Sequence, residues 1–307
     1  MNPSKVGSRT AERGFIVVAT LWLLAALAGL ILVGSVYMTQ SAIALGAFDA
    51  ATQLQMISTG GVELAAYQLS GVAPQARPTR GSFTFRLANA RIAVEYQSEA
   101  ARINLNMAPR STIAGLFTAL GVGSDAAVQL ADRVVAWRTA SRPSLQDEED
   151  SLYVAAGLKY LPRHAGFNNV DELSLVVGMP AALVERARPY LTLYSGIAGV
   201  NVLEAAPEVL AALPDMTAAK ADAFLNQRDS LASQDPGFVL GVLGGGVTGA
   251  TVSAGNAYRI RMHIILPDGR DSRSEGVIVL PDRGTKAAYR VFTWRDEIDP
   301  STGGTQR

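Results

Sequence analysis

Four adjacent acids, Asp147-Glu148-Glu149-Asp150, are the side chains in this chain with the clearest capacity for chemistry. Carboxylate oxygens are the ligands that Ca²⁺ prefers, and a calcium site gathers about six to eight oxygens from several directions. Adjacent acids lack the alternate spacing of a calcium-binding loop, so a solvated acidic loop is the default interpretation. We keep the four residues as candidate calcium ligands and expect at most a partly hydrated ion.

Other motifs that could carry chemistry are isolated. The stretch Gly244-Gly-Gly-Val-Thr-Gly249 has the spacing of a dinucleotide-binding loop, but no helical pattern follows it, and such a loop must open a helix. The chain has no cysteine and two histidines, His164 and His263, which lie far apart in sequence. No nucleophile–base pair or metal triad stands out, so we expect no enzyme. A membrane-tethered periplasmic enzyme is the weakest alternative.

The segment that decides the class of this protein is its N-terminus. A leader of residues 1–14 carries Lys5, Arg9 and Arg13, and 24 uncharged residues follow, from Phe15 to Met38. A helix of that length spans about 36 Å, enough to cross a bilayer. The next basic residue is Arg77. The positive-inside rule therefore predicts a cytoplasmic leader, with residues 39–307 across the membrane.

The position of a cleavable-looking Gly14-Phe15 pair separates two kinds of leader. A secretory signal peptide has an apolar region of about 7–15 residues and a cleavage site after it. Here the apolar run is longer and the Gly-Phe pair precedes it. That order resembles a type IV prepilin leader, whose apolar helix stays on the mature protein. An uncleaved signal anchor is the alternative.

Downstream, strand patterns flank a helical stretch. We expect the N-terminal helix to continue to about residue 72, with a bend near Gly60-Gly61. Alternating runs predict strands at 82–87, 91–96, 257–265, 274–280 and 289–294. Short helical patterns lie between them, at 109–120, 125–137, 170–177 and 181–190. Strands at both ends predict one α/β domain with a helical insertion.

The helical stretch contains an internal repeat. The run from Arg102 to Arg110, with Asn104, resembles the run from Gly199 to Glu208, with Asn201. Each leads to two helices and resembles a helix-hairpin-helix unit, which in DNA-binding proteins offers backbone N–H groups to a phosphate. Basic residues are not clustered at either turn, and the second turn carries Asp215. Packing of helix pairs is therefore favoured over a membrane-anchored DNA-binding protein of the competence type.

Together these features resemble the minor pseudopilin K family of type II secretion systems. The phrases that carry the resemblance are Arg13-Gly-Phe-Ile, Leu21-Trp-Leu-Leu, Arg102-Ile-Asn-Leu-Asn-Met-Ala, Val135-Ala-Trp-Arg138, Asn169-Val-Asp-Glu-Leu173, Gly178-Met, Arg188-Pro-Tyr-Leu-Thr192 and Asn201-Val-Leu-Glu-Ala-Ala-Pro207. The resemblance implies an α+β fold with an antiparallel pseudopilin sheet. The expected parts are a leader (1–14), an N-terminal helix (15–72, transmembrane over 15–38), the pseudopilin domain (73–102 and 241–295), an inserted helical domain with helix-hairpin-helix-like repeats (103–240) and a tail (296–307).

The resemblance also implies partners and processing. A protein K subunit sits at the tip of a periplasmic pseudopilus with minor pseudopilins I and J, anchored in the inner membrane. Prepilin peptidase would cut after Gly14 and methylate Phe15. Ala19 stands where most pilin-like helices carry Glu, a departure that the K type shares. The family's Asp-rich phrase around tryptophan, linked to calcium, reads Ala136-Trp-Arg-Thr-Ala-Ser141 here, which puts a bound calcium in doubt. No nucleic-acid partner is expected.

Overall fold

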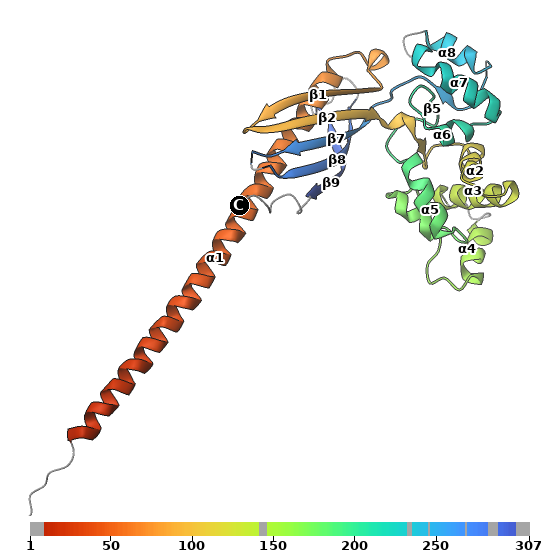
Figure 1. Ribbon diagram of the computed structural model, residues 1–307. Helices are drawn as coiled ribbons and strands as arrows, with labels where there is room; N and C mark the ends of the chain where they lie inside the picture. The colour runs from red at the N-terminus through yellow and green to blue at the C-terminus, as the bar shows by residue number, and fades with distance from the viewer. Residues whose placement is uncertain are drawn as a thin grey trace, which may run out of the picture. The chain divides into compact units, whose positions relative to one another are not determined.

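The computed structural model describes residues 9–140, 146–231, 235–244, 246–267, 269–281 and 288–298. The chain divides into two compact units, Met1–Thr59 and Gly60–Arg307. The first unit consists of most of one long helix. The second contains a sheet and a set of short helices (Figure 1).

Helix α1 spans Arg9–Ser70 as one continuous helix that includes the Gly60-Gly61 pair. Within it, Val17–Ser41 has a mean hydropathy of 2.5 and is 0% buried inside the protein. Two polar side chains there bond within the helix: the Thr20 and Thr39 hydroxyls donate to the Val17 and Ser35 carbonyls. An α-helix satisfies its backbone N–H and C=O groups internally, so a helix with an apolar outside is a structure that a bilayer accepts.

A five-stranded antiparallel sheet forms one half of the second unit, in the order β1-β2-β7-β8-β9. The strands are β1 (Arg80–Leu87), β2 (Ala90–Ser98), β7 (Ala257–Ile265), β8 (Asp271–Val279) and β9 (Arg290–Ile298). Alternate residues of β2 and β7 are buried on one face, among them Val94 and Met262. The last turns of α1 pack there, since a Cβ added to Gly61 would lie 2.3 Å from Met262 Sδ.

The helical region, residues 103–251, lies between β2 and β7 in sequence. It contains β3 (Ile103–Asn104), α2 (Arg110–Ala119), α3 (Ser124–Arg138), α4 (Gln146–Ala155), η3 (Val170–Leu175), α5 (Ala181–Ala187), η4 (Arg188–Tyr190), β4 (Leu191–Thr192), β5 (Val200–Asn201), α6 (Pro207–Ala211), α7 (Ala218–Leu231), α8 (Pro236–Val242) and β6 (Ala250–Thr251). The short 3-10 helices η1 (Pro74–Ala76) and η2 (Glu99–Ala101) flank β1 and β2. The core of the helical region includes Phe117, Trp137 and Phe224, all buried.

The two copies of the sequence repeat have the same local hydrogen bonds. Asn104 Oδ1 accepts from the Asn106 backbone N–H, and Asn201 Oδ1 accepts from the Leu203 N–H. An arginine from the following long helix then reaches back: Arg138 donates to the Ala108 carbonyl and Arg228 to the Ala205 carbonyl. Each unit also forms a two-residue parallel ladder, β3 with β4 and β5 with β6.

Two expectations differ from the structure. The acidic stretch is helix α4 from Gln146 onward rather than a loop, because Tyr153 is buried in the core with its ring 6.1 Å from that of Trp137. Strand β9 continues to Ile298, past the expected start of the tail, because its ladder with β8 runs on to the Ser272–Ile298 pair. Residues 299–307 of that tail lie outside the described residues.

Candidate functional site

The predicted processing and assembly residues, Gly14, Phe15 and Ala19, lie on α1. The Phe15 side chain is 76% exposed, and Ala19 is exposed as well. Ala19 leaves the apolar surface uninterrupted, whereas a carboxylate at that depth would cost about 2.5–3.5 kcal/mol by insertion scales and would need a partner. Cleavage after Gly14 and methylation of Phe15 stay predictions.

The acidic cluster is split by the geometry of α4. Successive side chains on a helix point about 100° apart, so neighbouring acids diverge. Asp150 contacts His164, with 2.9 Å between Oδ1 and Nε2. Glu149 turns inward: its Oε1 is buried and has no hydrogen-bond partner among the described residues, and burial raises its pKa while the Arg133 charge opposes the rise. The side chains of Asp147 and Glu148 lie outside the described residues.

The two described acids of this cluster, Glu149 and Asp150, do not form part of an assembled ligand set. Within the part of the chain that the structure describes, no group of three or more His, Cys, Asp or Glu side chains could hold a metal ion. The calcium site stays a prediction that solution measurements must test.

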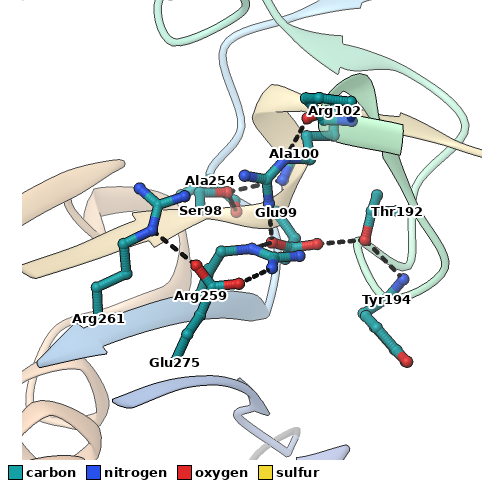
Figure 2. Close-up of polar contacts among 11 residues, drawn as sticks. Ser98, Glu99, Ala100, Arg102, Thr192, Tyr194, Ala254, Arg259, Arg261 and Glu275 are labelled. Atoms are coloured by element: carbon teal, nitrogen blue, oxygen red, sulfur yellow. Dashed lines mark hydrogen bonds and ion pairs between the residues drawn. The ribbon is translucent and has the colours of Figure 1, made fainter. Parts of the chain in front are cut away.

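The most connected polar site is one that the sequence reasoning missed. Glu99, in η2 directly after β2, is 0% exposed. Its Oε1 lies 2.5 Å from Arg102 Nη1 and 2.8 Å from Arg259 Nε, and its Oε2 accepts a hydrogen bond from the Thr192 hydroxyl (Figure 2). We call Glu99, Arg102, Thr192, Arg259, Arg261 and Glu275 the Glu99 junction.

Local hydrogen bonds fix the position of Glu99. Ser98 caps η2: its hydroxyl oxygen accepts from the Ala100 N–H at 3.0 Å and its O–H donates to the Ala254 carbonyl. Arg102 Nε donates to the Pro189 carbonyl at 2.9 Å. The junction therefore connects the end of β2 with two segments of the helical region that follow it by about ninety residues.

The charges of the junction alternate. Arg259 also pairs with Glu275 on β8, and Arg261 Nε lies 2.8 Å from Glu275 Oε2 (Figure 2). Burial lowers the pKa of Arg259, but Glu99 and Glu275 outweigh it and hold that pKa above its ordinary value. Burial likewise raises the pKa of Glu275, but its hydrogen bonds and charges from Arg261 and Arg259 bring it below the usual range. Charges buried in this way are tolerated because each has a partner.

Sequence comparison finds one family model that matches the central segment. Residues 86–196 match the family model "Type II secretion system (T2SS), protein K". This segment is similar to protein K of type II secretion systems. It includes Glu99, Arg102 and Thr192 of the junction, and it confirms the predicted resemblance to protein K. No curated protein matches the chain.

Comparison with solved structures confirms the predicted fold class. A chain in "The Crystal Structure of the GspK-GspI-GspJ complex from enterotoxigenic Escherichia coli Type 2 Secretion System" is similar, with a TM-score of 0.56 and 17% sequence identity. The match covers 82% of this chain and 98% of that chain. At this identity it shows the fold: an N-terminal apolar helix, an antiparallel sheet and helical elements.

Proposed function

We propose that this chain is a minor pseudopilin at the tip of a type II secretion pseudopilus, where it nucleates assembly with minor pseudopilins I and J. The single observation that carries the proposal is the protein K match over residues 86–196. The apolar, exposed segment Val17–Ser41 supports it, since a pseudopilin needs such a helix first as a membrane anchor and then for packing against its neighbours.

Membrane topology follows from charge. Lys5, Arg9 and Arg13 precede the apolar segment, and no basic residue follows before Arg77. The positive-inside rule places the leader in the cytoplasm and the second unit in the periplasm. In this arrangement prepilin peptidase cuts between Gly14 and Phe15 from the cytoplasmic side.

The I and J subunits are proposed as partners because the structurally similar chain was crystallised in a complex named GspK-GspI-GspJ. The role is structural rather than catalytic: the buried polar groups of the Glu99 junction pair with one another and leave no free nucleophile there. The DNA-binding alternative gains nothing from the second turn, where Asp215 holds a positive φ of 63° and offers a carboxylate to any phosphate.

The test uses the full chain, expressed with the prepilin peptidase and the I and J subunits of its own secretion system. Intact-mass analysis should show loss of residues 1–14 and one added methyl group, and I and J should co-purify in detergent. A Gly14→Leu variant is the matched control and should keep the leader. Full-length mass in the presence of the peptidase would contradict the processing, and absence of I and J from the purified protein would contradict the tip role.

A further inference from the structure

The Glu99 junction joins the sheet of the second unit to its helical region. On the sheet side it uses Arg259 and Arg261 of β7 and Glu275 of β8. On the side of the helical region it uses the Thr192 hydroxyl and, through Arg102, the Pro189 carbonyl. A neighbouring buried hydrogen bond, from Asn104 Nδ2 to Ser195 Oγ at 3.0 Å, holds the start of the helical region to the segment that follows β4.

The geometry makes Glu99 sensitive to any rotation of the helical region. Both guanidinium contacts are made by Oε1, and Oε2 is held by Thr192. If Thr192 moves away, a buried carboxylate oxygen loses its donor. A buried acceptor left without a partner carries a desolvation penalty larger than the net gain from an ordinary hydrogen bond. One orientation of β4 relative to η2 is therefore favoured over its neighbours.

Thr192 also connects to the far edge of the sheet. Its hydroxyl oxygen accepts the Tyr194 N–H at 3.1 Å, and the Tyr194 ring lies 5.4 Å from that of Phe292. Phe292 is the extra residue of a bulge in β9, where Val277 pairs with Thr293 and Ile278 with Val291. A bulge re-aims side chains locally. The Thr192 hydroxyl thus lies between the Glu99 contact at one side of the sheet and the Tyr194–Phe292 contact at β9.

We propose that Glu99, acting through Thr192, is a positioning residue that fixes the orientation of the helical region on the sheet, and that partner pseudopilins bind the chain in this orientation. The second half of the proposal rests on the proposed function. Glu99 itself is fully buried, so its side chain offers no surface to a partner subunit. Glu99 removes alternative orientations of the helical region before a partner subunit binds. The affinity for that partner rises because less conformational entropy is lost on binding.

Three substitutions separate positioning from folding. Thr192→Val keeps the shape of the side chain and removes the donor to Glu99, whereas Thr192→Ser keeps the hydroxyl and is the matched control. Glu185→Gln removes the charge of an exposed ion pair with Arg188, and Glu185 lies outside the Glu99 junction. It controls for a general loss of charge pairing.

The first measurement is a distance in the full chain, purified in detergent. Because the sequence has no cysteine, Thr84→Cys on β1 and Gln129→Cys on α3 give two exposed and unique labelling sites for spin labels. Thr192→Val should broaden the interspin distance distribution or add a second population, while Thr192→Ser and Glu185→Gln should keep the parent distribution. An unchanged distribution in Thr192→Val, with Tm also unchanged, overturns the positioning role.

The second measurement is binding of the I and J subunits to the same variants. Thr192→Val should weaken co-purification about fivefold or more, and Thr192→Ser should restore it. If the interspin distance distribution of Thr192→Val is broadened but the variant binds I and J normally, the link to assembly is overturned. If the unsubstituted chain does not bind I and J, the proposed function fails together with that link, and the distance measurement still decides the positioning role.

Discussion

Glu99 is fully buried and Glu149 is half-buried in the same unit, yet the surroundings of the two carboxylates are opposite. Glu99 has two guanidinium partners and a hydroxyl donor. Glu149 has a buried oxygen without a partner among the described residues, and burial raises its pKa. The difference teaches that burial alone does not make an acid important to a fold. A paired buried charge stabilises one arrangement of its neighbours, and an unpaired one costs free energy.

The largest expected effect is at the paired carboxylate. Glu99→Ala should destabilise the second unit by about 3–5 kcal/mol, because it leaves Arg102 and Arg259 with one fewer charge partner in a buried site. The matched control is Glu185→Ala, which removes another Glu–Arg pair of i,i+3 spacing, that of Glu185 with Arg188. The Glu185 side chain is 64% exposed. Exposed pairs contribute about 0–1 kcal/mol. Chemical denaturation of both variants should show this contrast, and equal losses would contradict it.

Glu149→Gln should stabilise the protein at pH 7, whereas Glu99→Ala destabilises it. The folded-state pKa of Glu149 is raised, so its contribution to stability is fully present below the unfolded pKa and is lost as pH rises through the folded value. Glutamine imitates the protonated form at every pH. The variant should therefore be more stable than the parent at pH 7, by up to about 1 kcal/mol, and the gain should vanish by about pH 4. Thermal melts across this range would contradict the comparison if the gain persisted in acid.

Glu275→Gln tests a carboxylate that is paired like Glu99 but less buried. It should reduce stability less than Glu99→Ala does, because Arg261 and Glu275 are partly exposed. The pKa of Glu275 is lowered in the fold, so its contribution is present above the unfolded pKa and is lost as pH falls through the folded one. The variant should melt below the parent at pH 7, and the two curves should converge in acid. A difference that grows as pH falls would contradict this.

The smallest expected effect is that of calcium. Adding Ca²⁺ and then chelator should not measurably move Tm of the full chain, because the Glu149 and Asp150 side chains diverge on α4 and the family's Asp-rich phrase is absent. A real site binding only the folded state must raise Tm at excess calcium. A large calcium-dependent rise that is abolished by Asp147→Ala together with Glu149→Ala would restore the metal site.

Much of the sheet could be predicted because its signal is local. The alternation in Ala257–Ile265 marks that strand without any knowledge of its neighbours. Helix α4 was missed because four acids outweighed the single buried Tyr153 in the pattern. The Glu99 junction was missed because its contacts are distant in sequence: Thr192 is 93 residues from Glu99 and Arg259 is 160. Periodicity carries no information about such pairs.

The pairing of β2 with β7 has a consequence for the order of folding. Ser98 pairs with Tyr258, so the central ladder of the sheet cannot close until the whole helical region has been synthesised. Until then β2 is paired on one side by β1 alone, and Glu99 lacks Arg259. The helical region has its own buried core and can fold first, which brings Ala257 back towards β2 and shortens the loop to be closed. The sheet's central ladder is then a late event in biogenesis, and a nascent chain arrested before residue 257 would expose an open β2 edge to proteases and to other chains.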